Sequence, residues 1–530
     1  MKQEKVKKSL VKSATIISLS TFLSRISGLM RDMVSAQVFG LSKVWDAFVY
    51  AFMIPNLLRR LVGEGALSSA FIPIYTEVLN QKGKEEADRV ANIVFSLLIT
   101  VLGIFLFIIH WIIKALLHYF VFSEKITLAL QLLLILFPYI FFLASVALFM
   151  GILNCHKRFF VTSFTPVLLN LIWIVTVIFF CSQIERSAEE KISILAWGVL
   201  FAGFAQVLFN FIPLLKLGFY PRFIFNLRHP ALVKIINLMA PAALGFSITQ
   251  INIFVDLSLA MFLGDGANSA LWYGNRLMQF PLGVFGIAMG TALLPTISHQ
   301  VAKNNIEGLK NTLSFSLRSV FLVIIPASVG LIVLREPIIR ICFERGQFDA
   351  YATGRTALTL LCYCFGLFAY SGIKLVVSAF YSLQDTKTPV KVGALCMILN
   401  IVFNIILMQF LREAGLALAT ALSSTINFIL LAWLLRNKIG SFEESKVIFS
   451  FIRIVVISII MGLFTHYFFI NFTFQIFNFS SLNLFIQIVI TICLSCIVYV
   501  ILGMLFRVSE MKKMVENCKD SLGNIIKTRD

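Results

Sequence analysis

The sequence predicts an all-α protein that crosses a membrane about fourteen times. Hydrophobic residues make up 59% of the 530 positions and charged residues only 13%, whereas soluble domains average roughly 45–50% and about 25%. The mean hydropathy is +0.91, and apolar runs of about 20 residues, long enough to span a bilayer, recur along the chain. Because hydrocarbon cannot hydrogen-bond an open backbone, these runs must be helical.

The apolar runs follow one another with short connections, which leave no room for a soluble domain. Their hydropathy defines the elements in chain order. The predicted spans are 14–39, 45–75, 91–117, 127–153, 161–182, 193–216, 232–263, 269–299, 313–334, 352–383, 389–411, 414–436, 448–470 and 483–506.

The distribution of Lys and Arg predicts the orientation. Most of the 45 basic residues fall in connections that share a side with the N-terminus, and basic residues favour the cytoplasm. Both termini are therefore predicted to be cytoplasmic. The connection 335–355 alternates basic with acidic residues and is predicted to be an amphipathic segment on the outside.

A weak internal repeat divides the spans. Ala70-Phe-Ile-Pro ends the second span as Ala292-Leu-Leu-Pro ends the eighth, and Asn170 corresponds to Asn400. Copies six spans apart share an orientation, which predicts two parallel six-helix lobes, an arrangement known among transporters. The predicted domains are 1–220, 221–440, and 441–530 for the last two helices and the tail.

Composition also excludes several functions. The net charge of +19 is spread between apolar segments without any nucleic-acid-binding motif, so no nucleic acid partner is predicted. Nucleotide-binding, metalloprotease and catalytic-triad motifs are absent from the sequence, so neither an enzyme nor direct ATP drive is indicated.

Five arginines inside the apolar runs are the strongest functional signal. Each costs at least roughly 2.5–3.5 kcal/mol at the bilayer centre, so compensation is required. A hydrated cationic cavity that accepts an anionic cargo would supply it. The candidate binding residues are Arg25, Arg31, Arg59, Arg60 and Arg276.

Three of these arginines allow another interpretation. Arg31 or Asp32 could neutralise a neighbour within the helix bundle instead of lining a cavity. Arg59 and Arg60 could follow the positive-inside rule, and one of them could pair with Glu64.

Arg276 has no acidic residue within four positions, and its polar neighbours Asn275 and Gln279 are neutral. Its guanidinium presents a fork of donors that matches phosphate oxygens. Lys374 adds a cation in the tenth span. Arg276 is therefore the best single candidate for an anionic ligand.

A second polar set could hold a small hard cation. Asp256, Asn400, Asn404 and Thr420 offer carboxylate, amide and hydroxyl oxygens, and the two asparagines share a helix face. Hydrogen bonding between helices is the alternative. Transport would use an ion gradient such as that of sodium, the membrane potential or downhill flow of the cargo, without any other cofactor.

The chain resembles the MurJ (MviN) lipid II flippases of the multidrug/oligosaccharidyl-lipid/polysaccharide exporter superfamily over nearly its whole length. The matching motifs are Ser24-Arg25-Ile-Ser-Gly-Leu-Met-Arg31-Asp32, Asp46-Ala-Phe, Pro55-Asn-Leu-Leu-Arg59-Arg60-Leu-Val-Gly-Glu64-Gly-Ala-Leu-Ser, Ala70-Phe-Ile-Pro, Asn275-Arg276-Leu-Met-Gln279-Phe-Pro and Asp385-Thr-Lys-Thr-Pro.

The resemblance implies a multi-pass protein of the bacterial inner membrane that flips undecaprenyl-pyrophosphate-linked GlcNAc–MurNAc-pentapeptide to the outer leaflet for peptidoglycan synthesis. Membrane lipids and the cell-wall synthesis and division machinery would be further partners. It also implies a cavity lined by Arg25, Arg31, Arg59 and Arg276, a functional Asp46, a groove for the lipid tail in the last two helices, and a sodium site at Asp256, Asn400, Asn404 and Thr420. Asn404 replaces an acid of some members, and Asn275 and Gln279 stand where some carry acids.

Two other functions compete. An exporter of another anionic lipid-linked saccharide would share the arginines, whereas a drug antiporter for cationic cargo would need acids in its cavity. A membrane scaffold would not need five intramembrane arginines. Loss of activity in a folded Arg276→Ala variant separates transport from a scaffold role.

Overall fold

A computed structural model describes residues 2–59, 67–182, 185–471, 481–512, 514 and 516. Within these ranges every regular element is a helix, and each of the fourteen predicted spans coincides with one helix or with consecutive helices. Among the described residues, ten helices are long and apolar enough to cross a membrane, or eleven if a bent pair counts as one span. Three of the fourteen predicted spans are not among these eleven: 14–39, 45–75 and 232–263. The predicted fold class is confirmed.

The chain forms two compact units. The first contains residues 1–269 and 345–349. Its helices are α1 (Lys2–Phe39), α2 (Lys43–Arg59), α3 (Ser68–Lys82), α4 (Lys84–Tyr119), α5 (Glu124–Leu136), α6 (Tyr139–Cys155), α7 (Phe159–Val175), the π-helix η2 (Thr176–Cys181), α8 (Ala188–Lys216), α9 (Pro230–Met261) and the start of α10 (Ala267–Pro281).

The second unit contains residues 270–344 and 350–530. It begins within α10. Its other helices are η3 (Leu282–Gly286), α11 (Ile287–Ala302), α12 (Ile306–Val333), α13 (Arg335–Phe343), α14 (Ala350–Cys364), α15 (Leu367–Ser382), α16 (Lys387–Leu411), α17 (Glu413–Ile439), α18 (Glu444–Asn471) and α19 (Ser481–Leu505). The short α13 occupies the connection predicted to be amphipathic. The lobes 1–220 and 221–440 stay a prediction.

Several predicted spans are interrupted helices. The span 127–153 consists of α5 and α6, which meet at a 43° bend. Pro138 stands between them, and proline removes a helical donor and clashes with the preceding turn. The span 269–299 consists of α10, η3 and α11, with the π-turn directly after Pro281.

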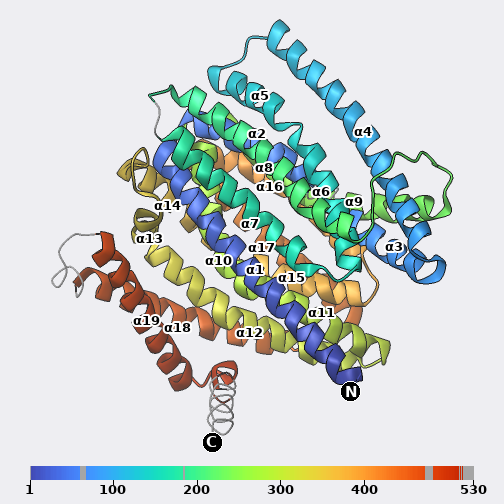
Figure 1. Cartoon of the computed structure of the whole chain (residues 1–530). Helices are drawn as coiled ribbons and strands as arrows, with labels where there is room; N and C mark the ends of the chain where they lie inside the picture. The colour runs from blue at the N-terminus through green and yellow to red at the C-terminus, as the bar shows by residue number, and fades with distance from the viewer. Residues whose placement is uncertain are drawn as a thin grey trace, which may run out of the picture. The chain divides into compact units, whose positions relative to one another are not determined.

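Aromatic packing builds the core of the first unit around Trp173. The indole of this α7 residue is fully buried and meets the rings of Phe48 and Phe52 edge-on, at centroid distances of 5.3 and 5.2 Å. Both phenylalanines belong to α2, and α1 packs along α7 (Figure 1).

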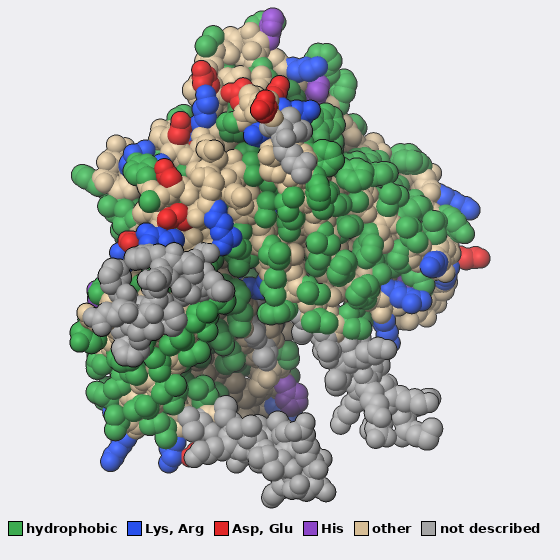
Figure 2. Space-filling view, turned by 60° about the vertical axis from the view of Figure 1, so that its left-hand side comes forward, with side chains coloured by type: hydrophobic (Ala, Val, Ile, Leu, Met, Phe, Trp, Pro, Cys, Tyr) green, Lys and Arg blue, Asp and Glu red, His purple; other side chains and the backbone are tan. Residues whose placement is uncertain are grey.

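Hydrophobic side chains also cover much of the visible outer surface, while charged ones gather toward its margins (Figure 2). Such a surface suits a hydrocarbon solvent.

A loop and a turn interlock in the same unit. The backbone N–H of Gln347 donates to the carbonyl of Gln37 at 2.9 Å. Gly40 and Gly346 both adopt positive φ, +58° and +56°. A Cβ on Gly40 would lie 2.2 Å from the Gln347 carbonyl oxygen, and one on Gly346 would lie 2.3 Å from that of Gln37. The residues 345–349 therefore dock backbone to backbone on the end of α1.

Candidate functional site

Arg31 lies in a buried network between α1 and α7. Its Nε and Nη2 donate to the same carboxylate oxygen of Asp32, at 3.0 and 2.7 Å. Its Nη1 donates to Oδ1 of Asn170 at 3.2 Å, and the guanidinium carbon stands 4.6 Å from the ring centroid of Trp173. Arg31 is 7% exposed and Asp32 is fully buried. The network therefore compensates the guanidinium with an acid, an amide and an aromatic face.

The seam continues along α1 on both sides of Arg31. Asn170 donates to the Ser24 carbonyl and to the Ser27 hydroxyl, at 3.2 and 3.0 Å. The Trp173 indole donates to the Ser35 hydroxyl at 2.9 Å. These side chains are spaced three or four residues apart on each helix, so they fall on facing stripes.

Arg25 and Arg59, the other described candidates of this unit, are both half-buried. Nε of Arg59 donates to Oδ1 of Asn56, one turn earlier on α2, at 2.9 Å. Arg59 and Arg31 both lie within electrostatic range of Tyr139 on α6. Two predicted binding residues thus share a neighbourhood. Arg60 and Glu64 lie outside the described residues.

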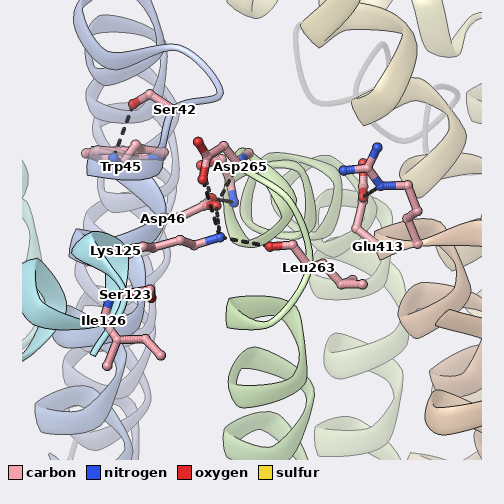
Figure 3. A network of polar contacts seen from close by, with 12 residues as sticks. Ser42, Trp45, Asp46, Ser123, Lys125, Ile126, Leu263, Asp265 and Glu413 are labelled. Carbon is pink, nitrogen blue, oxygen red and sulfur yellow. Dashed lines mark hydrogen bonds and ion pairs between the residues drawn. The ribbon is translucent and has the colours of Figure 1, made fainter. Parts of the chain in front are cut away.

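Asp46 is fully buried near the start of α2 and collects four polar contacts (Figure 3). The backbone N–H of Gly266 donates to Oδ2 at 2.8 Å, and both the N–H and the hydroxyl of Ser269 donate to Oδ1, at 2.8 and 2.6 Å. Lys125 from α5 forms an ion pair with Oδ2 at 2.8 Å and donates to the Leu263 carbonyl at 3.3 Å. One carboxylate therefore ties α2, α5 and the connection between α9 and α10.

Lys125 was missed by sequence reasoning. It stands directly before an apolar run, where it resembles an ordinary charge at a helix end. Its role depends on Asp46, which lies far away in sequence. A second buried pair, Arg355 with Glu413 at 2.6 Å, was missed for the same reason, since it joins α14 to α17 in the second unit.

The predicted residues of the eighth and tenth spans lie in the second unit. Arg276 and Asn275 are half-buried, whereas Gln279 is exposed and donates to the Asn275 amide oxygen at 2.5 Å. Lys374 is half-buried on α15, and its Cβ would lie 3.6 Å from a Cβ on Gly290 of α11. Arg276 can thus be reached in part from outside the protein interior.

The candidate cation set divides between the units. Asn400 and Asn404 are buried on α16, and Asn404 donates to the Asn400 amide oxygen at 2.8 Å. Asn400 donates in turn to the hydroxyl groups of Thr420 and Ser423 on α17, at 3.4 and 3.3 Å. The structure brings these residues together as a polar seam between helices. Asp256 is half-buried on α9, in the first unit.

Comparison with known proteins identifies the family. The family model "Lipid II flippase MurJ" matches residues 35–486. "Probable lipid II flippase MurJ" of Vibrio cholerae is 38% identical over 440 residues, covering 80% of this chain and 83% of the relative. "Lipid II flippase MurJ" of Burkholderia cenocepacia is 32% identical over 476 residues, covering 88% and 91%.

Solved structures agree with this match. A structure described as "Lipid II flippase MurJ, inward closed conformation" superposes with a TM-score of 0.77 at 28% identity, covering 93% of this chain and 99% of that one. An inward-facing multidrug resistance MATE transporter of the MOP superfamily shares the fold, with a TM-score of 0.67 at 17% identity, covering 79% and 96%. With a family model that spans most of its residues and relatives above 30% identity, this chain belongs to the lipid II flippase MurJ family.

Proposed function

We propose that this chain flips lipid II from the inner to the outer leaflet of the bacterial cytoplasmic membrane for peptidoglycan synthesis. The observation that carries the proposal is the family match along residues 35–486, with relatives that are named lipid II flippases. The chain is a multi-pass inner-membrane transporter rather than a catalyst. Its cargo carries a pyrophosphate, which the intramembrane arginines suit.

The arginines would take different parts in this transport. Arg25, Arg59 and Arg276 are half-buried, so part of each side chain is open to its surroundings, where a head group could contact it. Each offers a planar fork of donors for phosphate oxygens. Arg31 forms an ion pair with Asp32 and donates a hydrogen bond to Asn170. It would therefore contribute positive potential and hold α1 in position, rather than make the first contact with the cargo. Arg60 would add charge beside Arg59.

Asp46 would act on the conformational cycle. Its contacts fasten α2, α5 and residues 263–269 together, at the end that the Lys and Arg distribution predicts to be periplasmic. Alternating access requires that end to open while the other closes. Opening there would release Lys125 or the Ser269 donors from the carboxylate. Only a cargo that binds the two states differently can shift their populations.

Coupling to an ion remains part of the proposal. Asn400, Asn404 and Thr420 share one polar seam in the second unit, and their amide and hydroxyl oxygens would suit a small hard cation such as sodium. The membrane potential is the other candidate driving force. Both termini would be cytoplasmic, and the cell-wall synthesis and division machinery would be partners.

The test measures outer-leaflet lipid II in cells depleted of this protein, by cleavage with an external lipid II-degrading toxin. Rescue is attempted with wild type, Arg276→Ala and, as a matched control, Arg158→Ala, which removes an exposed charge between α6 and α7. We expect wild type and the control to restore cleavage and Arg276→Ala to fail at equal expression. Unchanged cleavage on depletion, with no second flippase present, would move the assignment to another anionic lipid-linked saccharide.

A further inference from the structure

A pocket of about 160 Å³ opens in the second unit, and none of the residues discussed so far lines it. It lies where α12 and α18 meet the residues that follow α19. Its walls include Arg318 of α12, Lys446, Phe449 and Arg453 of α18, and Glu510. Three basic side chains around one small pocket at the edge of the predicted spans require an explanation.

Two of the three cations are already matched. Arg318 forms an ion pair with Glu510, whose side chain is only 4% exposed, and the Ser450 hydroxyl donates to the same carboxylate at 3.4 Å. Lys446 pairs with Glu443 at 2.5 Å. The Arg318–Glu510 pair and the Ser450 hydrogen bond join α12, α18 and the segment after α19, whereas the Lys446–Glu443 pair is local to the start of α18. One cation of the pocket then remains without an acidic partner among those described.

That cation is Arg453. Its side chain is half-buried, and the guanidinium carbon stands 4.1 Å from the ring centroid of Phe449. Within the described ranges no carboxylate pairs with it. The ring covers one face of the guanidinium, while the donors at its edge stay available. Ser509 lines the same pocket with an exposed side chain. The pocket therefore carries one positive charge in excess and a hydroxyl beside it.

The surface next to the pocket is hydrocarbon-like. Ile448, Phe449 and Ile452 on α18 are 58%, 57% and 53% exposed. Arg453 lies about one turn inside the predicted span 448–470, near the depth at which long basic side chains reach for lipid head groups. The Lys and Arg distribution predicts that this end of α18 lies on the cytoplasmic side. The cytoplasmic leaflet of the membrane holds anionic lipids.

We propose that this pocket binds the phosphodiester head group of an anionic phospholipid, with the phosphate on Arg453 and the acyl chains along α18. A phosphodiester carries one negative charge, which equals the excess of the pocket. Basic pockets between transmembrane helices on the cytoplasmic side are a known form of lipid site. The bound lipid would bridge α18 and the segment after α19, and the site is independent of lipid II.

The experiment counts lipids on the purified full chain by native mass spectrometry during titration with phosphatidylglycerol, with phosphatidylcholine as the uncharged comparison. The variants are Arg453→Gln, Ser509→Asp and the control Arg158→Gln, which removes the same charge from an exposed connection. We expect wild type and the control to hold one phosphatidylglycerol preferentially. Arg453→Gln should weaken it about tenfold or more, the value of a hydrogen bond to a charged group. Ser509→Asp, at an exposed position, should weaken it through the added negative charge.

Equal retention of phosphatidylglycerol by Arg453→Gln and wild type would overturn the site. Equal losses of the lipid in Arg453→Gln and Arg158→Gln would also overturn it, because they would indicate attraction by a diffuse surface charge. A further arm adds inorganic phosphate without lipid. If millimolar phosphate displaced the lipid and gave wild type the same thermal stabilisation as phosphatidylglycerol, the pocket would be a free-anion site. Failure of lipid II flipping would not affect either result.

Discussion

Asp46 and Lys125 form an ion pair of 2.8 Å between α2 and α5, and their side chains are 0% and 8% exposed. The same two elements carry an exposed pair, Lys43 with Glu124 at 2.6 Å. The two pairs differ in burial but join the same helices. They therefore provide an internal comparison of buried and exposed charge.

Asp46→Asn should lower the thermal midpoint in detergent strongly, because it removes the nearer, buried counter-charge of Lys125 and leaves only the exposed Asp265 at 4.0 Å. Removal of one partner from a buried pair costs about 3–5 kcal/mol. Glu124→Gln should have a much smaller effect, since exposed pairs contribute little. The double variant Asp46→Asn/Lys125→Met should recover part of the loss. Equal effects of the buried and exposed single variants would contradict this account.

Arg31→Lys should reduce both stability and flipping, although it keeps the charge. Lysine cannot donate from two nitrogens to Asp32 while reaching Asn170 and lying over Trp173. Arg25→Lys, on the same helix and half-buried, should retain more of the stability. The comparison uses thermal unfolding together with toxin accessibility of lipid II. Identical behaviour of the two variants would show that the network adds nothing beyond charge.

Gly346→Ala should destabilise the protein by at least about 1–2 kcal/mol, the cost of a left-handed conformation for a residue with a Cβ. The new methyl group would also displace the carbonyl of Gln37, which lies 2.3 Å from its position. Gly354→Ala is the matched control, because nothing lies within 4 Å of its added Cβ and its helix favours alanine. We expect a lower thermal midpoint for Gly346→Ala alone. Equal thermal midpoints for the two variants would contradict the close backbone contact between residues 345–349 and the end of α1.

Asp385 gives a dependence on pH. A hydrogen bond from Lys438, followed by donors of Thr388, lowers the pKa of this carboxyl from 3.8 to about 2. The folded state therefore prefers the carboxylate, and this contribution is present above about pH 4 and disappears as the pH falls toward 2. The stability difference between wild type and Asp385→Asn should follow the same course. A difference that stayed constant across that range would exclude the Lys438 pair as its source.

Hydropathy sufficed for the helices, because each span must satisfy its backbone alone in hydrocarbon. The predicted spans 389–411 and 414–436 differ from α16 and α17 by at most three residues. The polar partners could not be predicted in this way. Lys125 acquires its partner only through the packing of α5 on α2, and Gln347 meets Gln37 across more than three hundred residues of sequence. A charge in an apolar run is conspicuous, which singled out Arg31, and the family resemblance singled out Asp46. The partners of both residues depend on tertiary structure.

The seam of polar contacts along α1 also limits how this helix can move. A slide or turn of α1 against α7 would strip Arg31 of Asn170 and Trp173, and would leave Asn170 without Ser24 and Ser27 in a medium that offers no replacement donors or acceptors. The penalty falls on several groups at once, because these contacts share Arg31 and Asn170. During transport these two helices should travel as one rigid body, and the flexibility of the cycle must reside elsewhere in the chain.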